Sequence, residues 1–223
     1  MIKPYYETEL GKLYHGNCID ILSQLDEKVD LTLTDPPYGM GSILKVRGHG
    51  LKAIERGSLA NWDKNFEPSS IPWPDCGLVA FTLDWRIPQW YALKSTGRIL
   101  IWHKTNATPS LRKQFVNAAE FIFCDAKFYY RTHRNSQTVL SGPFDTNPYR
   151  PHPCKKPDWL IRELIGMFSL PNHLLLDPFL GSGTTAIACE RLDRRWIGIE
   201  ISKEYCDIAV ERIEQERSQL KLI

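Results

Sequence analysis

The chain has 223 residues, 43% of them hydrophobic, and a formal net charge of +2 from 28 basic and 26 acidic side chains. This length predicts one α/β domain over residues 1–223, with a full core and little room for a second. No run of about 18 apolar residues occurs, which argues against a membrane-spanning helix, and the first residues lack the apolar segment of a secretion signal. The six cysteines contain no CxxC pair. We therefore expect no bound metal, reduced thiols and a cytoplasmic protein.

The first third of the chain alternates between strand and helix patterns. A short strand is predicted over residues 11–15 and a short amphipathic helix over residues 19–25. Residues 29–34 form a near-continuous apolar run, which is typical of a strand buried on both faces of a parallel sheet.

The tetrapeptide Asp35-Pro36-Pro37-Tyr38 ends this apolar strand. Two prolines fix φ and remove two backbone donors, so the strand must stop and its carbonyl groups turn toward a ligand. Asp35 and the Pro36 carbonyl can then accept both hydrogens of an amino group, while Tyr38 offers a ring on which a flat base can stack. The alternative interpretation is an ordinary polar turn after a strand.

A loop insertion is predicted over residues 39–74, which are rich in Gly, Ser, Pro and charge and show no core periodicity. A short helix is expected inside it near residues 43–56. This part of the loop carries a basic group, formed by Lys45, Arg47, Lys52 and Arg56.

Three strands are expected next, over residues 78–83, 98–102 and 121–128, of which the last two form an antiparallel, hairpin-like edge of the sheet. A basic segment follows between residues 127 and 156, with six lysines and arginines against the single acid Asp145. Several aromatic residues are interleaved with these bases, a mixture that suits phosphate contact and base stacking. The predicted basic loop, residues 129–151, is therefore a candidate DNA-contacting segment. Ordinary solvated loops are the alternative.

The last part of the chain contains a glycine-rich turn between a strand and a helix. A helix over residues 157–168 precedes the apolar strand 174–177, and another helix begins near Thr184. Glycines let the backbone approach a ligand, and the free N–H groups of a helix start favour an anionic group.

A second apolar strand is predicted over residues 196–201, with the acid Glu200 near its end, 17 positions beyond Gly183. This is close to the spacing at which an acid of a Rossmann-type fold meets ribose hydroxyls. A final helix is capped by Ser202. Alternating strands and helices predict a doubly wound α/β sheet, mostly parallel with an antiparallel edge strand.

Together, Asp35-Pro36-Pro37-Tyr38 and Asp177-Pro178-Phe179-Leu180-Gly181-Ser182-Gly183-Thr184 resemble the motifs of the amino-directed DNA methyltransferases that use S-adenosylmethionine. The catalytic motif comes first and the cofactor motif last, which resembles the permuted beta class and its small phage and prophage members. The resemblance covers residues 13–205 and implies a Rossmann-like methyltransferase fold, a methyl transfer to a flipped-out adenine of double-stranded DNA, and S-adenosylmethionine as the cofactor.

The resemblance also implies roles for individual residues. The catalytic residues would be Asp35, Pro36, Pro37 and Tyr38. The cofactor-binding residues would be Asn17, Cys18, Lys156, Asp177, Phe179, Gly181, Ser182, Gly183, Thr184, Thr185, Glu200 and Ile201. The nucleic-acid contacts would be Lys45, Arg47, Arg131, Arg134 and Arg150. Within this set, Asn17 stands where the family usually has an acid that binds the adenine amino group of the cofactor, and Lys156 would pair with the cofactor carboxylate.

Several alternatives stay open at this point. The target could be the N4 amino group of cytosine, although Asp at the first position of the catalytic motif favours adenine. Methylation of a protein glutamine or of RNA, and a non-enzymatic DNA-binding protein with a degenerate methylase fold, are less favoured. The resemblance leaves open a homodimer, and either a cognate restriction enzyme or an orphan phage enzyme that has none.

Overall fold

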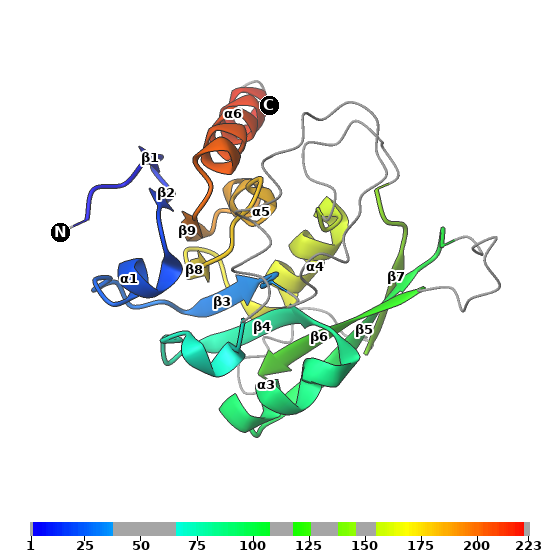
Figure 1. The fold of residues 1–223 in the computed structure, drawn as a ribbon. Coiled ribbons are helices and arrows are strands. Elements are labelled where there is room, and N and C mark those ends of the chain that lie inside the picture. The colour runs from blue at the N-terminus through cyan, green and yellow to red at the C-terminus, as the bar shows by residue number, and fades with distance from the viewer. Residues whose placement is uncertain (1, 38–65, 108–117, 126–137, 146–154, 221–223) are drawn as a thin grey trace.

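The computed structural model describes residues 2–37, 66–107, 118–125, 138–145 and 155–220. Within them, nine strands form one sheet in the order β1-β2-β9-β8-β3-β4-β6-β5-β7 (Figure 1). The strands are β1 (Tyr6–Glu7), β2 (Gly11–His15), β3 (Leu31–Thr34), β4 (Gly77–Thr82), β5 (Gly97–Lys104), β6 (Ala119–Asp125), β7 (Val139–Gly142), β8 (Leu174–Asp177) and β9 (Arg195–Glu200). The helices are α1 (Cys18–Leu22), α3 (Ile87–Leu93), α4 (Asp158–Phe168), α5 (Thr184–Arg191) and α6 (Lys203–Leu220), with 3-10 turns η2 (Pro68–Ser70) and η3 (Asp84–Arg86). No described helix is both long and apolar enough to cross a membrane.

The middle of the sheet is parallel. β3 pairs in parallel with β4 on one side and with β8 on the other, and β8 continues to β9 and β2 in the same direction. β1 is antiparallel at one edge, and β6 runs antiparallel between β4 and β5. The predicted mostly parallel sheet with an antiparallel edge is therefore confirmed. The predicted antiparallel pair, β5 and β6, forms as expected, but β7 adds outside it in parallel with β5.

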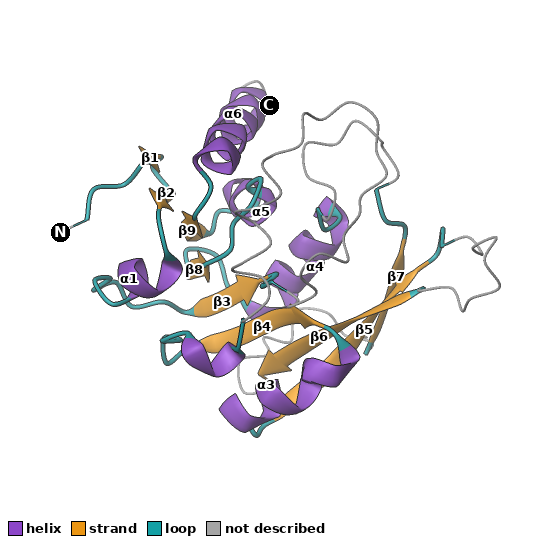
Figure 2. Cartoon of the chain, in the orientation of Figure 1, coloured by secondary structure: helices purple, strands orange, loops and turns teal. Residues whose placement is uncertain are grey.

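Helices cover both faces of the sheet (Figures 1 and 2). Leu31, Leu33 and Leu175 pack into the core cluster that also contains the buried faces of α4, α5 and α6. Leu174 and Leu176 point to the opposite face, where they share a cluster with α1. Because successive side chains of a strand point to opposite faces, the continuous apolar runs predict a sheet that is covered on both sides.

Two details of the predicted loops are wrong in their described parts. The end of the 39–74 insertion belongs to the core, because Phe66 and Ile71 are only 6% and 7% exposed. Isolated apolar residues among prolines and serines give no periodic signal, so this packing could not be read from the pattern. The predicted loop 129–151 contains β7, a strand of four residues that pairs in parallel with β5. Residues 38–65 and the helix predicted near 43–56 lie outside the described part.

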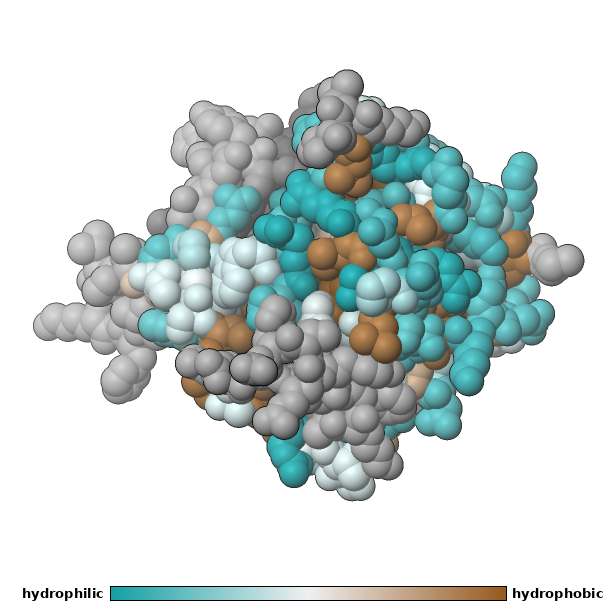
Figure 3. Space-filling view, turned by 180° about the vertical axis from the view of Figure 1, so that it is seen from behind, coloured by the Kyte–Doolittle hydropathy of each residue, from teal (hydrophilic) through white to brown (hydrophobic). Residues whose placement is uncertain are grey.

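The rear surface of the molecule is mainly hydrophilic where it is described. Figure 3 shows teal and white residues with hydrophobic ones in separate small patches. This agrees with a sheet whose apolar faces are both used internally by helices.

Candidate active site

The two sequence motifs lie side by side at the carboxyl edge of the sheet. β3 and β8 are parallel neighbours, with Leu31 opposite Leu175 and Thr32 opposite Leu176. The turn after each strand therefore emerges at the same edge, although the motifs are about 140 residues apart in the chain. The chain leaves β3 toward β4 and leaves β8 toward β9, so this edge is a point where the strand order reverses. Ligands of open α/β sheets bind at such points.

Asp177 joins the two motifs inside the protein. Its Oδ1 accepts hydrogen bonds from the Thr34 hydroxyl at 2.9 Å and from the Phe179 backbone at 3.1 Å, and its Oδ2 accepts one from the Thr185 hydroxyl at 2.7 Å. Burial raises the pKa of Asp177 to about 6 against these three hydrogen bonds, which favour the charged form. The carboxyl group thus fixes the end of β3, the glycine turn and the start of α5 to one another. Direct contact of Asp177 with a cofactor stays a prediction.

The glycine turn has the backbone that its sequence predicts. Gly181 and Gly183 have φ values of +55° and +85°, a region that favours glycine. A Cβ on Gly181 would meet no atom of the described residues within 4 Å, so this part of the structure leaves space open beside the backbone. Gly183 caps α5 and packs against Ala209 of α6, and the neighbouring Ser182 carbonyl and hydroxyl accept hydrogen bonds from Arg212. Thr184 is buried at the first position of α5.

Glu200 ends β9 beside this turn. Its Oε2 accepts a hydrogen bond from the Gly181 backbone and its Oε1 from the Ser202 backbone, both at 2.8 Å. Glu200 is only 8% exposed. Burial raises the pKa of its carboxyl group, although these two hydrogen bonds favour the charged form. A carboxylate oxygen accepts more than one hydrogen bond, so Glu200 can hold the turn and still bind a hydroxyl group.

The remaining predicted cofactor residues differ in exposure and in hydrogen bonding. Asn17 is exposed, and its side-chain oxygen already accepts a hydrogen bond from the Ile19 backbone at 3.0 Å as the cap of α1. Cys18 is buried, and burial raises its pKa to about 11. Ile201 is exposed next to Glu200, and Phe179 is half-buried with its ring edge-to-face against Phe66 at 5.6 Å.

These features fit S-adenosylmethionine. The open space beside Gly181 admits a ligand against the backbone, and Glu200 provides acceptors for ribose hydroxyls. Phe179 and Ile201 offer apolar surface at the same edge. The structure gives the arrangement of these residues, and their contacts with the cofactor are predictions.

Lys156 has a partner that the sequence does not predict. Its ammonium lies 2.5 Å from Asp35 Oδ2, 3.6 Å from Glu120 Oε2 and 4.9 Å from the centre of the Phe81 ring. Glu120 Oε1 in turn binds Lys104 at 2.7 Å. The family resemblance implies that Lys156 pairs with the cofactor carboxylate, whereas the structure places its ammonium beside Asp35, the predicted acceptor of the target amino group. Glu120 was missed because no local pattern marks an acid at the start of an edge-side strand as part of a distant site.

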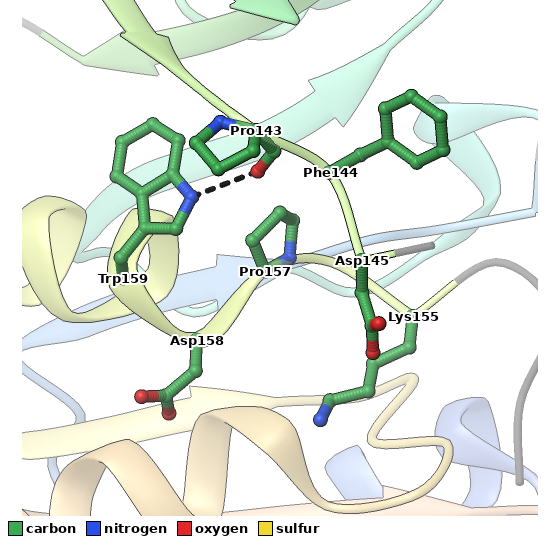
Figure 4. A pocket seen from close by; sticks show the side chains of 7 residues that line it. All are labelled: Pro143, Phe144, Asp145, Lys155, Pro157, Asp158 and Trp159. Atoms are coloured by element: carbon green, nitrogen blue, oxygen red, sulfur yellow. Dashed lines mark hydrogen bonds between the residues drawn. The ribbon is translucent and has the colours of Figure 1, made fainter. Parts of the chain in front are cut away.

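A separate hollow of about 280 Å³ lies between the end of β7 and the start of α4 (Figure 4). Trp159 forms one side and donates a hydrogen bond to the Pro143 carbonyl at 3.0 Å, while Asp145 and Lys155 lie on the other side. The side chains of the two adjacent lysines thus lie in different sites: Lys155 lines this hollow, and Lys156 reaches Asp35. The predicted residues outside the described part are Tyr38, Lys45, Arg47, Arg131, Arg134 and Arg150.

The doubly wound sheet and the paired turns at its switch point define the class of Rossmann-like methyltransferases. Comparison with known proteins narrows this class. A family model described as DNA methylase matches residues 126–211. The chain is 28% identical to the type II methyltransferases M2.LlaDCHI of Lactococcus lactis subsp. cremoris and M2.DpnII of Streptococcus pneumoniae. The alignments cover 96% and 97% of this chain and 93% and 94% of those proteins.

Solved structures agree. The complex of M1.HpyAVI with S-adenosylmethionine is 27% identical, with a TM-score of 0.63 over 91% of this chain and 99% of that one. The cytosine-N4-specific PvuII DNA methyltransferase has the same fold, with a TM-score of 0.68 at 18% identity over 97% of this chain and 94% of that one. The resemblance predicted from the motifs is confirmed: the chain is similar to amino-directed DNA methyltransferases, and one of the similar structures is a complex with S-adenosylmethionine.

Proposed function

We propose that this enzyme methylates the exocyclic N6 amino group of an adenine that is flipped out of double-stranded DNA. The observation that carries the proposal is the placement of Asp35 at the end of β3, next to the glycine turn that follows β8. Asp35 accepts the target amino group, and the glycine turn forms a wall of the ligand space at the same edge of the sheet.

The protein has to make a poor nucleophile reactive. The lone pair of an adenine amino nitrogen is delocalised into the ring. Hydrogen bonds from its two hydrogens to Asp35 and the Pro36 carbonyl favour a more tetrahedral nitrogen with an available lone pair. S-adenosylmethionine, when bound, supplies the electrophilic methyl group. The residues contribute position and electrostatics, which are the main sources of rate in such a transfer.

The base must leave the duplex before it can reach this edge, at a cost of a few kcal/mol. Tyr38 follows Pro37 directly, and we propose that it stacks on the extruded base. The basic residues Lys45, Arg47, Arg131, Arg134 and Arg150, which come from the segments 39–74 and 129–151, would hold the phosphates around it. We further propose one methyltransferase domain over residues 1–223 that acts in the cytoplasm. The hypothesis includes a homodimer, and either a cognate restriction enzyme or an orphan phage enzyme that has none.

The test is a product analysis. The enzyme is incubated with duplex DNA and methyl-labelled cofactor, and the DNA is digested to nucleosides. We expect the label in N6-methyldeoxyadenosine. Label in N4-methyldeoxycytidine would move the target to cytosine and leave the chemistry of Asp35 intact. Label in added protein or RNA, with none in DNA, would contradict the proposal.

A further inference from the structure

Trp85 is the most exposed large hydrophobic residue in the described part of the chain, at 54%. It lies in the short turn η3, three residues after the end of β4. β4 is the parallel neighbour of β3, with Ala80 opposite Thr34, so the turns after both strands emerge at the same edge of the sheet (Figure 1). Because neighbouring strands are about 4.8 Å apart, the chain that leads into η3 starts one strand spacing from the turn that carries Asp35.

The indole ring of Trp85 is supported from behind by a buried cation. The guanidinium carbon of Arg86 lies 4.4 Å from the ring centre, and Arg86 is only 4% exposed. Arg86 Nη1 donates a hydrogen bond to the Phe66 carbonyl at 2.6 Å, and Asp84 Oδ1 accepts one from the Trp85 backbone at 2.9 Å. One face of the indole thus rests on a fixed group, so most of the exposed area comes from the opposite face.

The same contacts connect Trp85 with the glycine turn. The Phe66 ring centre lies 5.6 Å from the guanidinium carbon of Arg86, and the Phe66 ring meets the ring of Phe179 edge-to-face at 5.6 Å. Phe179 follows β8 and Trp85 follows β4, the two strands on either side of β3. A row of packed side chains therefore passes the end of β3, with the cofactor turn at one end and the exposed indole at the other.

A flat nucleobase is the partner that fits an indole in this position. Aromatic rings stack on any base, because every base has a π-face. A stable protein interface needs about 800 Å² on each partner, whereas the neighbours of Trp85 in η3 are the exposed Asp84 and the buried Arg86. In the proposed function the target base comes to the adjacent turn, where Asp35 binds its amino group and Tyr38 covers one of its two faces.

We propose that Trp85 stacks on the flipped target base, on the face that Tyr38 leaves open. The rigid indole then holds the plane of the base while Asp35 binds its amino group. Trp85 is thus a substrate-binding residue that takes no part in proton or methyl transfer. This inference rests on the proposed function, because it requires the target base to reach the turn after β3.

The experiment separates stacking from recognition of the amino group. Three duplexes carry the mapped methylation site, with adenine, purine or an abasic residue at the target. Affinities are measured by fluorescence anisotropy with S-adenosylhomocysteine bound, so no turnover is involved. Trp85→Leu keeps apolar contact with Arg86 and removes the aromatic face. We expect its affinity to fall about tenfold for the adenine and purine duplexes, through the loss of one base–aromatic stack, and to change less than about twofold for the abasic duplex.

Two further variants are the controls. Trp85→Phe keeps a flat ring and should retain most of the affinity for all three duplexes. Tyr91→Ala removes another exposed aromatic ring, which packs against Phe123 of β6, and should leave the three affinities unchanged. Calorimetric titration with S-adenosylmethionine should give the same cofactor affinity for Trp85→Leu as for the unmodified enzyme.

Other outcomes would overturn the inference. If Trp85→Leu weakens all three duplexes alike, or none of them, Trp85 does not stack on the target base. If the loss appears with adenine and not with purine, Trp85 acts on the amino group instead of the ring. A parallel loss of cofactor affinity would make Trp85 a structural support of the glycine turn. Product analysis keeps the two claims apart: when methyladenine is formed, these outcomes overturn the stack alone, whereas DNA without methyladenine overturns the proposed function and this inference with it.

Discussion

Asp35 is the residue on which the chemistry depends most directly. It is 29% exposed at the carboxyl end of β3, so it can meet a ligand, and it is held in place by Lys156. We predict that Asp35→Ala lowers methyl transfer by at least about 100-fold, as removal of one preorganised group in an active site commonly does. Cofactor affinity should stay within about twofold, because Asp35 has no predicted contact with the cofactor.

A tritium-transfer assay and calorimetric titration with S-adenosylmethionine test this pair of expectations. Asp35→Asn is the matched control for shape, since it keeps the size of the side chain and weakens its acceptor. Loss of cofactor binding with normal turnover of the bound fraction would place Asp35 in the cofactor site instead.

Asp177 carries a prediction about pH. Burial raises its pKa from an ordinary 3.8 to about 6. Between these values the folded protein binds more protons at this group than the unfolded chain, so the free energy of unfolding falls as pH rises from about 4 to about 6. The share of Asp177 is on the order of 2 to 3 kcal/mol.

Asp177→Asn removes this titration. Relative to the unmodified protein, the variant should therefore gain stability as pH rises through that window. Urea unfolding at pH 4.5 and pH 7 measures the difference. A stability difference that is the same at both values would show that Asp177 does not titrate in this range.

At the scale of elements, the two glycines of the turn have different roles: Gly183 serves packing between helices and Gly181 serves ligand binding. Gly183 has a φ of +85°, and a Cβ there would lie 3.0 Å from the Cβ of Ala209 in α6. Gly183→Ala should therefore lower stability by about 1–3 kcal/mol through backbone strain, with added cost from the contact between α5 and α6. Gly181 has a φ of +55° and an open surrounding. Gly181→Ala should cost less stability and should weaken cofactor binding, because its methyl group fills the proposed ligand space.

Urea unfolding and calorimetry on the two variants form a matched pair. The expected pattern is a larger loss of stability for the alanine at 183 and a larger loss of cofactor affinity for the alanine at 181. Unchanged cofactor affinity in Gly181→Ala would move the ligand away from this turn.

The elements also explain what could be read from the sequence. β3, β8 and β9 are buried along nearly their whole length and are therefore rich in apolar residues. Each ends in a distinctive turn or acid, so strands and motifs were predicted together. β7 escaped because a four-residue edge strand has an exposed pattern without apolar periodicity. The pairing of Lys156 with Asp35, and the arrival of Glu120 beside them, depend on strand order and on the reversed direction of β6. Neither has a local signal in the chain.

At the scale of the molecule, the sheet brings functional groups from both ends of the chain to one edge. Asn17 follows β2, Asp35 follows β3, and Glu200 ends β9, a strand from the other end of the chain that lies between these two in the sheet order. Lys104 ends β5 and Glu120 is the second residue of β6, so the same edge continues into the antiparallel part. A permuted order of motifs is therefore compatible with one active edge, because the sheet depends on which strands are neighbours.

The whole-molecule prediction concerns salt. The net charge of +2 gives little attraction to DNA by itself, so binding must depend on the local basic loops. If four to six phosphates are neutralised, counterion release predicts a slope on the order of −4 to −5 for the logarithm of the binding constant against the logarithm of salt concentration. Replacing Arg131 and Arg134 with Ala should flatten this slope and weaken all duplexes alike, because phosphate contacts carry no sequence information. Anisotropy titrations between 50 and 200 mM salt, a range of about fourfold, measure both effects on cognate and unrelated duplexes. A loss confined to the cognate duplex would mean that these arginines read bases, and an unchanged slope would place the phosphate contacts elsewhere on the molecule.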